Sequence, residues 1–213
     1  MAAAAQAAGR DPASVRLVCV SKRHPASAIA EAYAAGERDF GENYVQELVD
    51  KSSELRASCP DLRFHMIGHL QTNKAKHVAE HAFAVHSVDS VRLVVELEKR
   101  AAPTAAPLQV LVEVSLAGES QKGGAPVSEV EAIAAAVESA PHLALAGLMT
   151  MPPFGDLVEA ERVFRALAAL REEHGGAARW PELSMGMSDD MEIAVRCGAT
   201  IVRVGTAIFG ARA

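Results

Sequence analysis

The sequence is poor in aromatic residues and has no excess of positive charge. Aromatic side chains make up 4% of its 213 residues, so the core must be built mainly from Ala, Val, Leu, Ile and Met. That composition suits helices packed on a buried parallel sheet. The formal net charge is −6, which argues against nucleic acid as a partner, because nucleic-acid-binding domains usually carry a basic face.

Cysteines and long hydrophobic runs are also scarce. Cys19, Cys59 and Cys197 are odd in number and far apart, a pattern that fits neither a disulfide framework nor a zinc site. We therefore expect no metal and a reducing, cytoplasmic setting. Residues 1–9 lack the basic region of a signal peptide. No apolar run approaches the roughly 18 residues of a membrane span, so we expect no membrane association.

Short apolar runs alternate with longer amphipathic segments along the chain. The predicted strands are residues 17–20, 39–41, 63–67, 83–87, 110–114, 143–149, 183–185 and 200–204. The predicted helices are residues 28–35, 44–56, 71–81, 90–101, 126–140, 159–174 and 189–197, and a further helix starts after the last strand. Strands that alternate with helices in this way pair in parallel through right-handed crossovers.

Eight strand–helix units in series favour an α/β fold with a closed barrel, the (β/α)8 or TIM barrel, built as a single domain over residues 1–213. A doubly wound open sheet is the alternative, because it contains the same alternation of strands and helices. The chain is shorter than the about 250 residues that such a barrel usually takes. We expect the difference to lie in short loops and terminal segments.

A lysine follows the first predicted strand, at the position where a barrel of this kind places its functional residues. Lys22 comes after the apolar run 17–20. An amine with apolar surroundings is shifted toward its neutral, nucleophilic form. The structural alternative is a lysine whose stem covers apolar surface while its ammonium group reaches water.

Two turns with small residues follow the last two predicted strands. Gly205 lets the backbone approach a ligand closely, Thr206 adds a hydroxyl, and the helix that starts there offers N–H groups to an anion. The turn at 184–188 is similar, and barrels often bind phosphate in these loops. The structural alternative is that the glycines only form tight turns and that Ser188 only caps a helix. A lysine and a phosphate site together suit pyridoxal 5′-phosphate (PLP) or the phosphorylated sugar of a Schiff-base aldolase.

Six motifs resemble those of the pyridoxal phosphate homeostasis protein family, in order and across residues 17–210. They are Val20-Ser21-Lys22 and the segments 40–47, 65–74, 147–150, 183–191 and 202–210. The resemblance implies a barrel of the alanine racemase N-terminal-domain type and PLP held by Lys22 as a Schiff base. It also implies that the protein buffers or delivers this cofactor in vitamin B6 homeostasis.

The resemblance further implies a set of cofactor-binding residues. Besides Lys22 they are Asn43, Met149, Met185, Ser184, Arg203, Gly205 and Thr206. Ser184, Gly205 and Thr206 are expected at the phosphate and Arg203 at the ring nitrogen. Asn43 is expected at the polar edge of the ring, with the two methionines packed around it, although methionine at a strand end is also common in cores.

The sequence departs from the family pattern near the lysine. Arg23-His24 stands where a Thr-Lys pair is more common, and Cys19 stands where alanine is usual. We expect the thiol of Cys19 to point into the core and to be inert. We also expect part of the family's first helix to be missing. These differences concern the rim of the barrel rather than the expected site.

A cationic partner at the ring nitrogen favours a carrier over an enzyme. Arg203 disfavours protonation of the ring, and we expect no second domain that could supply a base. Within the chain the candidates for a racemase-type base are Tyr44, His65 and His69, each with a structural alternative. We therefore assign no catalytic residue and retain a racemase-like enzyme as an alternative.

The expected partners are PLP and PLP-dependent apo-enzymes that would receive it, and we expect a monomer. Lys122 lies in a glycine-rich loop after the fifth predicted strand. It is a candidate second lysine for cofactor transfer, although a loop lysine in solvent has the same sequence pattern.

Overall fold

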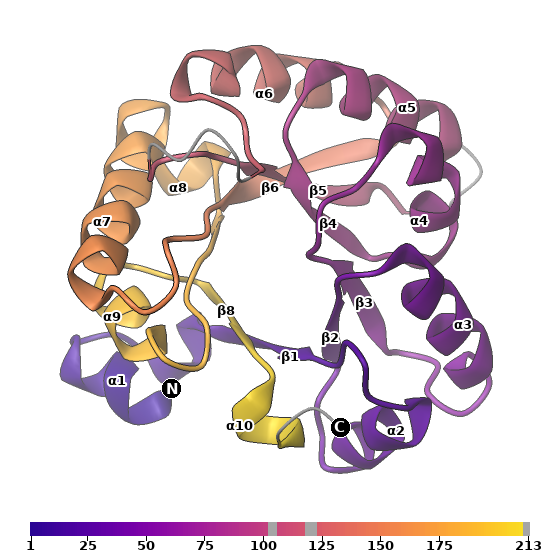
Figure 1. Ribbon diagram of the computed structural model, residues 1–213. Helices are drawn as coiled ribbons and strands as arrows, with labels where there is room; N and C mark the ends of the chain where they lie inside the picture. The colour runs from indigo at the N-terminus through magenta and orange to yellow at the C-terminus, as the bar shows by residue number, and fades with distance from the viewer. Residues whose placement is uncertain (102–105, 118–122, 211–213) are drawn as a thin grey trace.

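The computed structural model describes residues 1–101, 106–117 and 123–210 and contains a closed barrel of eight parallel strands (Figure 1). The strands are β1 (Arg16–Val20), β2 (Asp39–Glu42), β3 (Arg63–Met66), β4 (Ala84–Val88), β5 (Leu108–Glu113), β6 (Leu143–Met149), β7 (Glu182–Ser184) and β8 (Ile201–Val204). Each strand pairs with its neighbour in sequence, and β8 pairs with β1. The predicted (β/α)8 fold is confirmed, and the open doubly wound sheet is excluded.

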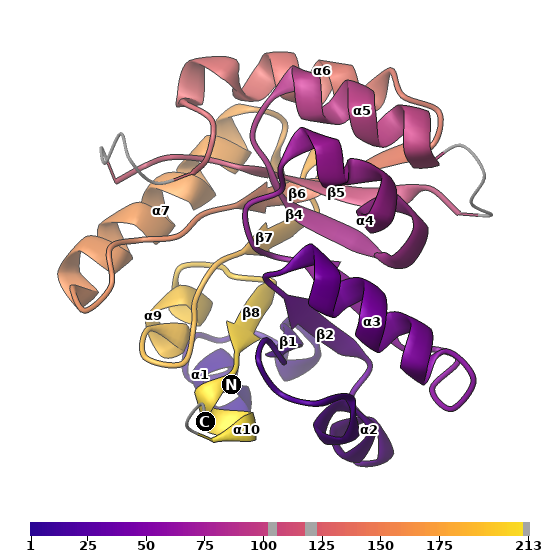
Figure 2. The same cartoon turned by 45° about the vertical axis from the view of Figure 1, so that its right-hand side comes forward.

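Helices surround the barrel as an outer ring (Figures 1 and 2). They are α2 (Ala26–Ala34), α3 (Val45–Leu55), α4 (Ala75–His81), α5 (Val91–Ala101), α6 (Val130–Glu138), α7 (Leu157–Glu173), α9 (Met191–Arg196) and α10 (Thr206–Phe209). Single 3-10 turns at Thr72–Lys74 and Val127–Glu129 precede α4 and α6. The helices expected at 71–81 and 126–140 therefore begin with a tighter turn than predicted.

Two short helices escape the sequence prediction. One is α1 (Ala2–Ala7), in which Ala5 is fully buried and which packs against α9. Arg10, just after α1, donates hydrogen bonds to the carbonyls of Val195 at 2.9 Å and Ala199 at 2.7 Å. These tertiary contacts hold the N-terminal arm against the end of the barrel, although its alanine-rich sequence has no amphipathic pattern.

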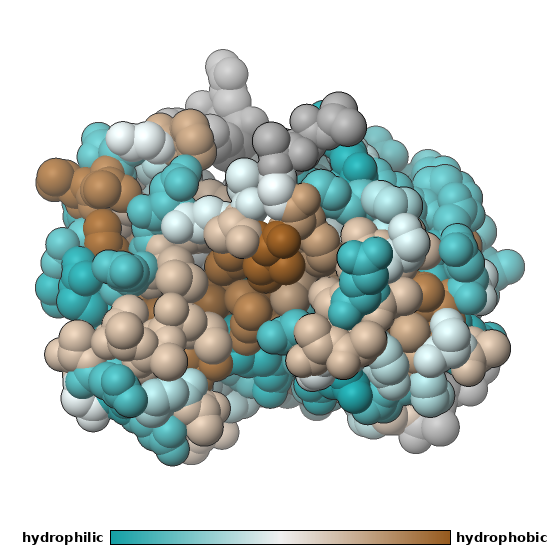
Figure 3. Space-filling view, turned by 90° about the horizontal axis from the view of Figure 1, so that it is seen from below, coloured by the Kyte–Doolittle hydropathy of each residue, from teal (hydrophilic) through white to brown (hydrophobic). Residues whose placement is uncertain are grey.

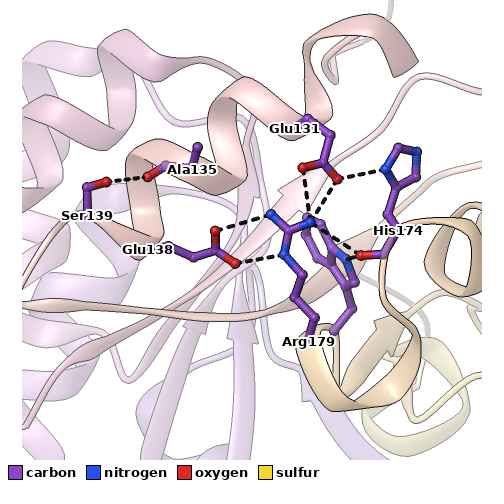
Figure 4. Close-up of polar contacts among 7 residues, drawn as sticks. Glu131, Ala135, Glu138, Ser139, His174 and Arg179 are labelled. Atoms are coloured by element: carbon purple, nitrogen blue, oxygen red, sulfur yellow. Dashed lines mark hydrogen bonds and ion pairs between the residues drawn. The ribbon is translucent and has the colours of Figure 1, made fainter.

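The second unpredicted helix is α8 (Gly176–Arg179), which follows α7 directly. Arg179 in α8 hydrogen-bonds both Glu138 and Glu131 of α6, at 2.7 and 2.9 Å (Figure 4). The bonds to Glu138, more than those to Glu131, raise the pKa of this guanidinium. His174 pairs with Glu131 at 2.7 Å. This cluster joins α6 to the end of α7, so α8 depends on tertiary contacts rather than on local propensity.

The core has two parts that differ in composition. The larger part lies between the strands and the helices and is apolar. The smaller part lies inside the barrel and contains Val18, Leu111, Ala146, Met149 and Ile201. The rest of the interior holds buried polar side chains, namely Asp39, His65, His86, Ser184 and Arg203. A parallel barrel usually fills this space with branched apolar residues, so the polar interior needs its own hydrogen bonds.

Apolar side chains are exposed around the start of α7. Phe154 and Val158 are 83% and 84% exposed, and Met151 and Leu157 are about half exposed. Figure 3 shows an apolar group at the left edge of the surface, at the side where α7 lies in Figure 1. Within the described ranges, no helix combines the length and the hydrophobicity that a bilayer crossing requires.

Gly147 provides a test of the barrel's close strand packing. It pairs with Glu182 across β6 and β7, and a Cβ at this position would lie 1.9 Å from the Glu182 carbonyl oxygen. The substitution Gly147→Ala should therefore lower the free energy of unfolding by about 2 kcal/mol or more. The control is Gly123→Ala, because the nearest atoms to a Cβ there lie 3.6 Å away. Equal urea denaturation midpoints for the two variants would contradict this packing.

Candidate functional site

The C-terminal end of the barrel brings the first and last strands together at Lys22. Alternation along β1 sends Val18 into the barrel, and Lys22 lies two residues beyond the end of that strand. Gly205 lies beyond the end of the neighbouring strand β8, and a Cβ added to it would be 3.1 Å from the Val20 carbonyl oxygen. The lysine expected to bind a ligand and the turn expected to bind phosphate are therefore side by side. Lys22 is half-buried, whereas Thr206 is exposed.

A buried ion pair holds the residue before Lys22. Glu42 is fully buried, and its Oε1 accepts hydrogen bonds from Ser21 Oγ at 2.7 Å and Lys51 Nζ at 2.8 Å. The ammonium of Lys51 also donates to the Ser21 carbonyl at 2.9 Å. Burial raises the pKa of Glu42 despite these bonds, and its Oε2 has no hydrogen-bond partner among the described residues. The network fixes the backbone from which Lys22 projects.

The residues after Lys22 are fixed from the same side. Arg23 is the one residue other than glycine with a positive φ, 63°, within the described ranges, a conformation that costs L-residues about 1 kcal/mol or more. Its backbone N–H donates to Glu47 Oε2 at 2.7 Å, and Glu47 also accepts from Lys51 at 2.7 Å. The guanidinium of Arg23 hydrogen-bonds Tyr44 Oη at 3.3 Å. The departure from the family pattern at this residue therefore forms a contact across the rim.

His24 connects the Lys22 loop to the last helix. Its ring lies 5.1 Å from the ring of Phe209, at an interplanar angle of 30°. Phe209 ends α10, the helix that starts at Thr206. Arg23 and His24, which replace the usual Thr-Lys pair, thus connect the Lys22 loop to Tyr44 on one side and to α10 on the other.

Asn43 follows β2 and is packed against β3. A Cβ at Gly68 would lie 2.3 Å from the Asn43 carbonyl oxygen, so the approach of the two loops requires glycine at this position. Asn43 is half-buried. The structure thus places it at the same mouth of the barrel as Lys22, one strand away.

Arg203 lies inside the barrel, below the Gly205 turn. Its side chain is buried, and it donates to Ser184 Oγ at 2.6 Å and to the Thr150 carbonyl at 3.1 Å. Burial lowers the pKa of Arg203 to about 10, and the charges of Glu113 and Asp190 oppose that shift. The guanidinium therefore remains cationic at neutral pH, with neutral oxygen atoms as its hydrogen-bond acceptors.

The remaining predicted residues fall in different layers. Met149 belongs to the cluster inside the barrel, whereas Met185 belongs to the larger core that includes the helices. Cys19 is also fully buried in the larger core, and burial raises its pKa to about 12, so that its thiol stays protonated. Lys122 lies outside the described residues.

The three candidate bases differ in accessibility. His65 is fully buried, and both its ring nitrogens are engaged, at 2.8 Å from Asp39 Oδ1 and 2.9 Å from His86 Nε2. It is therefore not placed to act on a ligand at the mouth. Tyr44 and His69 are exposed at the rim, with 64% of the His69 side chain accessible. Among the described residues, no cluster of three or more His, Cys, Asp or Glu could hold a metal ion.

Sequence reasoning missed Asp39, Glu42, Glu47, Lys51 and His86. Glu42 and Glu47 were inside a recognised motif, but their roles depend on Lys51, four residues beyond Glu47 on the same face of α3. That spacing is a usable signal. His86 lies within the predicted fourth strand and gave no signal, because its partners come from β3 and β7.

Comparisons with known proteins agree with this arrangement. The family model for the alanine racemase N-terminal domain matches residues 2–213. A pyridoxal phosphate homeostasis protein of Pseudomonas aeruginosa is 47% identical over 210 residues, covering 98% of this chain and 90% of that protein. The homologue of the same name from Escherichia coli K12 is 45% identical over 217 residues, covering 100% of this chain and 92% of that protein.

A solved structure extends the comparison to three dimensions. PipY of Synechococcus elongatus, solved with PLP bound, has a TM-score of 0.85 and 39% sequence identity, with 97% of each chain covered. The resemblance inferred from the six motifs is confirmed. This chain belongs to the pyridoxal phosphate homeostasis protein family and has the fold of the alanine racemase N-terminal domain.

Proposed function

We propose that the protein binds PLP through Lys22 and acts in vitamin B6 homeostasis as a buffer or carrier of this cofactor. The observation that carries the proposal is the placement of Lys22 beside Gly205 at one mouth of the barrel, in a loop held by the Glu42–Lys51 pair. PipY, which shares 39% of its sequence, was solved with PLP bound. PLP supplies an aldehyde that condenses with a lysine amine to a Schiff base and releases water.

The residues around Lys22 fit such a ligand. The backbone turn at Gly205 has no side chain on the face next to Val20, and Thr206 exposes a hydroxyl beside it. This turn would hold the phosphate ester, since backbone N–H groups and a hydroxyl suit a phosphate. Arg203, deeper in the barrel, would face the ring nitrogen, and Asn43 the polar edge of the ring.

The charge at the ring nitrogen supports a carrier. A protonated pyridine ring would be the stronger electron sink for amino-acid chemistry, and the cation of Arg203 would disfavour a second positive charge beside it. His65, one of the three candidate bases, is committed to the barrel interior. We therefore propose non-catalytic binding as the main role and assign no catalytic residue.

Partners and setting follow from the same role. The proposed partners are PLP and the PLP-dependent apo-enzymes that would receive it, with the protein acting as a single-domain monomer. The three cysteines are free and buried, which suits the reducing cytoplasm that we propose as its location.

The first prediction concerns covalent binding. Purified protein mixed with PLP should develop visible absorbance, and borohydride reduction should fix one label on Lys22, as peptide mass spectrometry would detect. Lys22→Ala should abolish the label, whereas Lys76→Ala, an exposed lysine on α4, should retain it. A wild-type protein that takes up no PLP, or a label on another lysine, would overturn the proposal.

The second prediction concerns the loop that carries Lys22. Lys51→Met leaves Glu42 buried without its cation, which should cost about 3–5 kcal/mol of unfolding free energy. It should also weaken PLP binding about tenfold, because the Ser21 carbonyl loses its donor. Burial already raises the pKa of Glu42, and the variant should raise it further. In the variant, the folded state then tolerates protonated Glu42 better than ionised Glu42. Because Glu42 is more fully ionised at high pH, the loss of stability should be larger at pH 8 than at pH 5.

A matched control separates this effect from the loss of any lysine. Lys99→Met removes an exposed ammonium, 62% accessible, that lies 3.5 Å from Glu96. That variant should lose less than about 0.5 kcal/mol and keep its PLP affinity. Denaturation curves at the two pH values and a fluorescence titration with PLP measure both effects. Equal behaviour of the two variants would show that the Lys51 network does not hold the loop.

A further inference from the structure

A continuous chain of buried polar side chains crosses the barrel from Arg203 to Asp39. Arg203 Nη1 lies 2.6 Å from Ser184 Oγ, which lies 2.8 Å from His86 Nδ1. His86 Nε2 lies 2.9 Å from His65 Nδ1, and His65 Nε2 lies 2.8 Å from Asp39 Oδ1. All five side chains are buried, and each step is within hydrogen-bonding distance.

The two ends of the chain fix which groups donate. A guanidinium has only donors, so Ser184 Oγ accepts from Arg203. At the other end Asp39 also receives a hydrogen bond from Arg63 at 2.6 Å. Burial opposes ionisation of Asp39, but the bonds from His65 and Arg63 outweigh it and lower its pKa. The carboxylate is therefore charged and accepts from His65.

Between these ends, neutral histidines leave one consistent arrangement. Burial lowers the pKa of His65 and His86, and a neutral imidazole has one donor and one acceptor nitrogen. His65 donates from Nε2 to Asp39, so its Nδ1 accepts from His86 Nε2. His86 Nδ1 must then accept, and the Ser184 hydroxyl donates to it. If donation ran in the reverse direction, the lone pair of His65 Nε2 would face Asp39 Oδ1 at 2.8 Å. These two buried acceptors would then have no hydrogen between them.

From this direction of hydrogen-bond donation, we propose that four side chains are positioning residues that hold Arg203 against the ring nitrogen of bound PLP. They are Asp39, His65, His86 and Ser184. The inference rests on the proposed function. Arg203 keeps neutral acceptors at Ser184 and Thr150, and the buried charge of Asp39 is relayed to it through oriented dipoles.

The direction of donation along this chain also changes the role expected for Ser184. Its hydroxyl hydrogen points to His86, and one of its lone pairs receives Arg203. The side chain therefore has no hydrogen left for a phosphate, and that task falls to the turn at Gly205 and Thr206. Ser184 acts on the cofactor through Arg203.

A direct test is the tautomer of each histidine in the wild-type protein. Nitrogen-15 NMR distinguishes Nε2–H, Nδ1–H and doubly protonated imidazoles. Both His65 and His86 should be neutral Nε2–H tautomers at pH 7, with and without PLP. A Nδ1–H tautomer or a charged ring at either position would overturn the inference. Because this readout needs no cofactor, its failure is distinguishable from a failure of PLP binding.

A second test separates ring contacts from phosphate contacts by comparing PLP with pyridoxal, which lacks the phosphate. Ser184→Ala should weaken the binding of both ligands by the same factor, about tenfold. Thr206→Ala should weaken PLP binding and leave pyridoxal binding unchanged. A Ser184→Ala variant that loses affinity only for PLP would assign the hydroxyl to the phosphate and overturn the inference.

Conservative replacement at His86 distinguishes positioning from general stability. His86→Gln retains one donor and one acceptor, so it should keep PLP affinity within about threefold and the visible spectrum of the loaded protein. His86→Leu should weaken binding about tenfold and shift that spectrum, while borohydride still labels Lys22. His77→Leu, an exposed histidine on α4, is the control and should change neither. Indistinguishable spectra and affinities for the two His86 variants would overturn the inference.

Discussion

Two buried carboxylates on one four-residue strand organise the polar part of this protein. Alternation along β2 directs Asp39 into the barrel and Glu42 toward α3. A carboxylate removed from water must be compensated by donors and cations. Glu42 accepts hydrogen bonds from Ser21 and Lys51, and these bonds hold the loop of Lys22 in place. Asp39 accepts hydrogen bonds from Arg63 and His65. The chain then continues through His86 and Ser184 to Arg203 on the other side of the barrel. Gly41 lies between them, without a side chain to obstruct the interior.

In the proposed function, the distribution of charge in the interior favours holding PLP over activating it. Among the described residues, the hydrogen-bond acceptors of Arg203 are neutral oxygen atoms, whereas Glu113 and Asp190 interact with it through their charges. Its charge is therefore not cancelled by a directly bound carboxylate. In the proposed function this charge would face the ring nitrogen, where it would oppose protonation and leave the ring a weaker electron sink.

The fold was predictable because it depends on alternation and period, which the sequence carries locally. The eight apolar runs correspond to the eight strands, and their boundaries differ from the structure by two residues at most. Lys22, Asn43, Gly205 and Thr206 were predictable as residues that follow strands. His86 was not, because it looks like any residue of a buried strand until β3 and β7 bring His65 and Ser184 to it. The helices α1 and α8 were missed for a related reason, since contacts with α9 and α6 stabilise them.

The seam between β1 and β8 joins the beginning of the barrel to its end. Pairing runs from Arg16↔Ile201 to Cys19↔Val204, and only non-covalent contacts close the ring of strands there. In the proposed function, a ligand bonded to Lys22 and held at Gly205 would span this seam. The bound cofactor would then link β1 to β8, and the barrel could open at this seam only after the ligand had left one of the two strands. The supply of PLP would then set how readily the barrel unfolds, because the empty form would open and be degraded more easily than the loaded form.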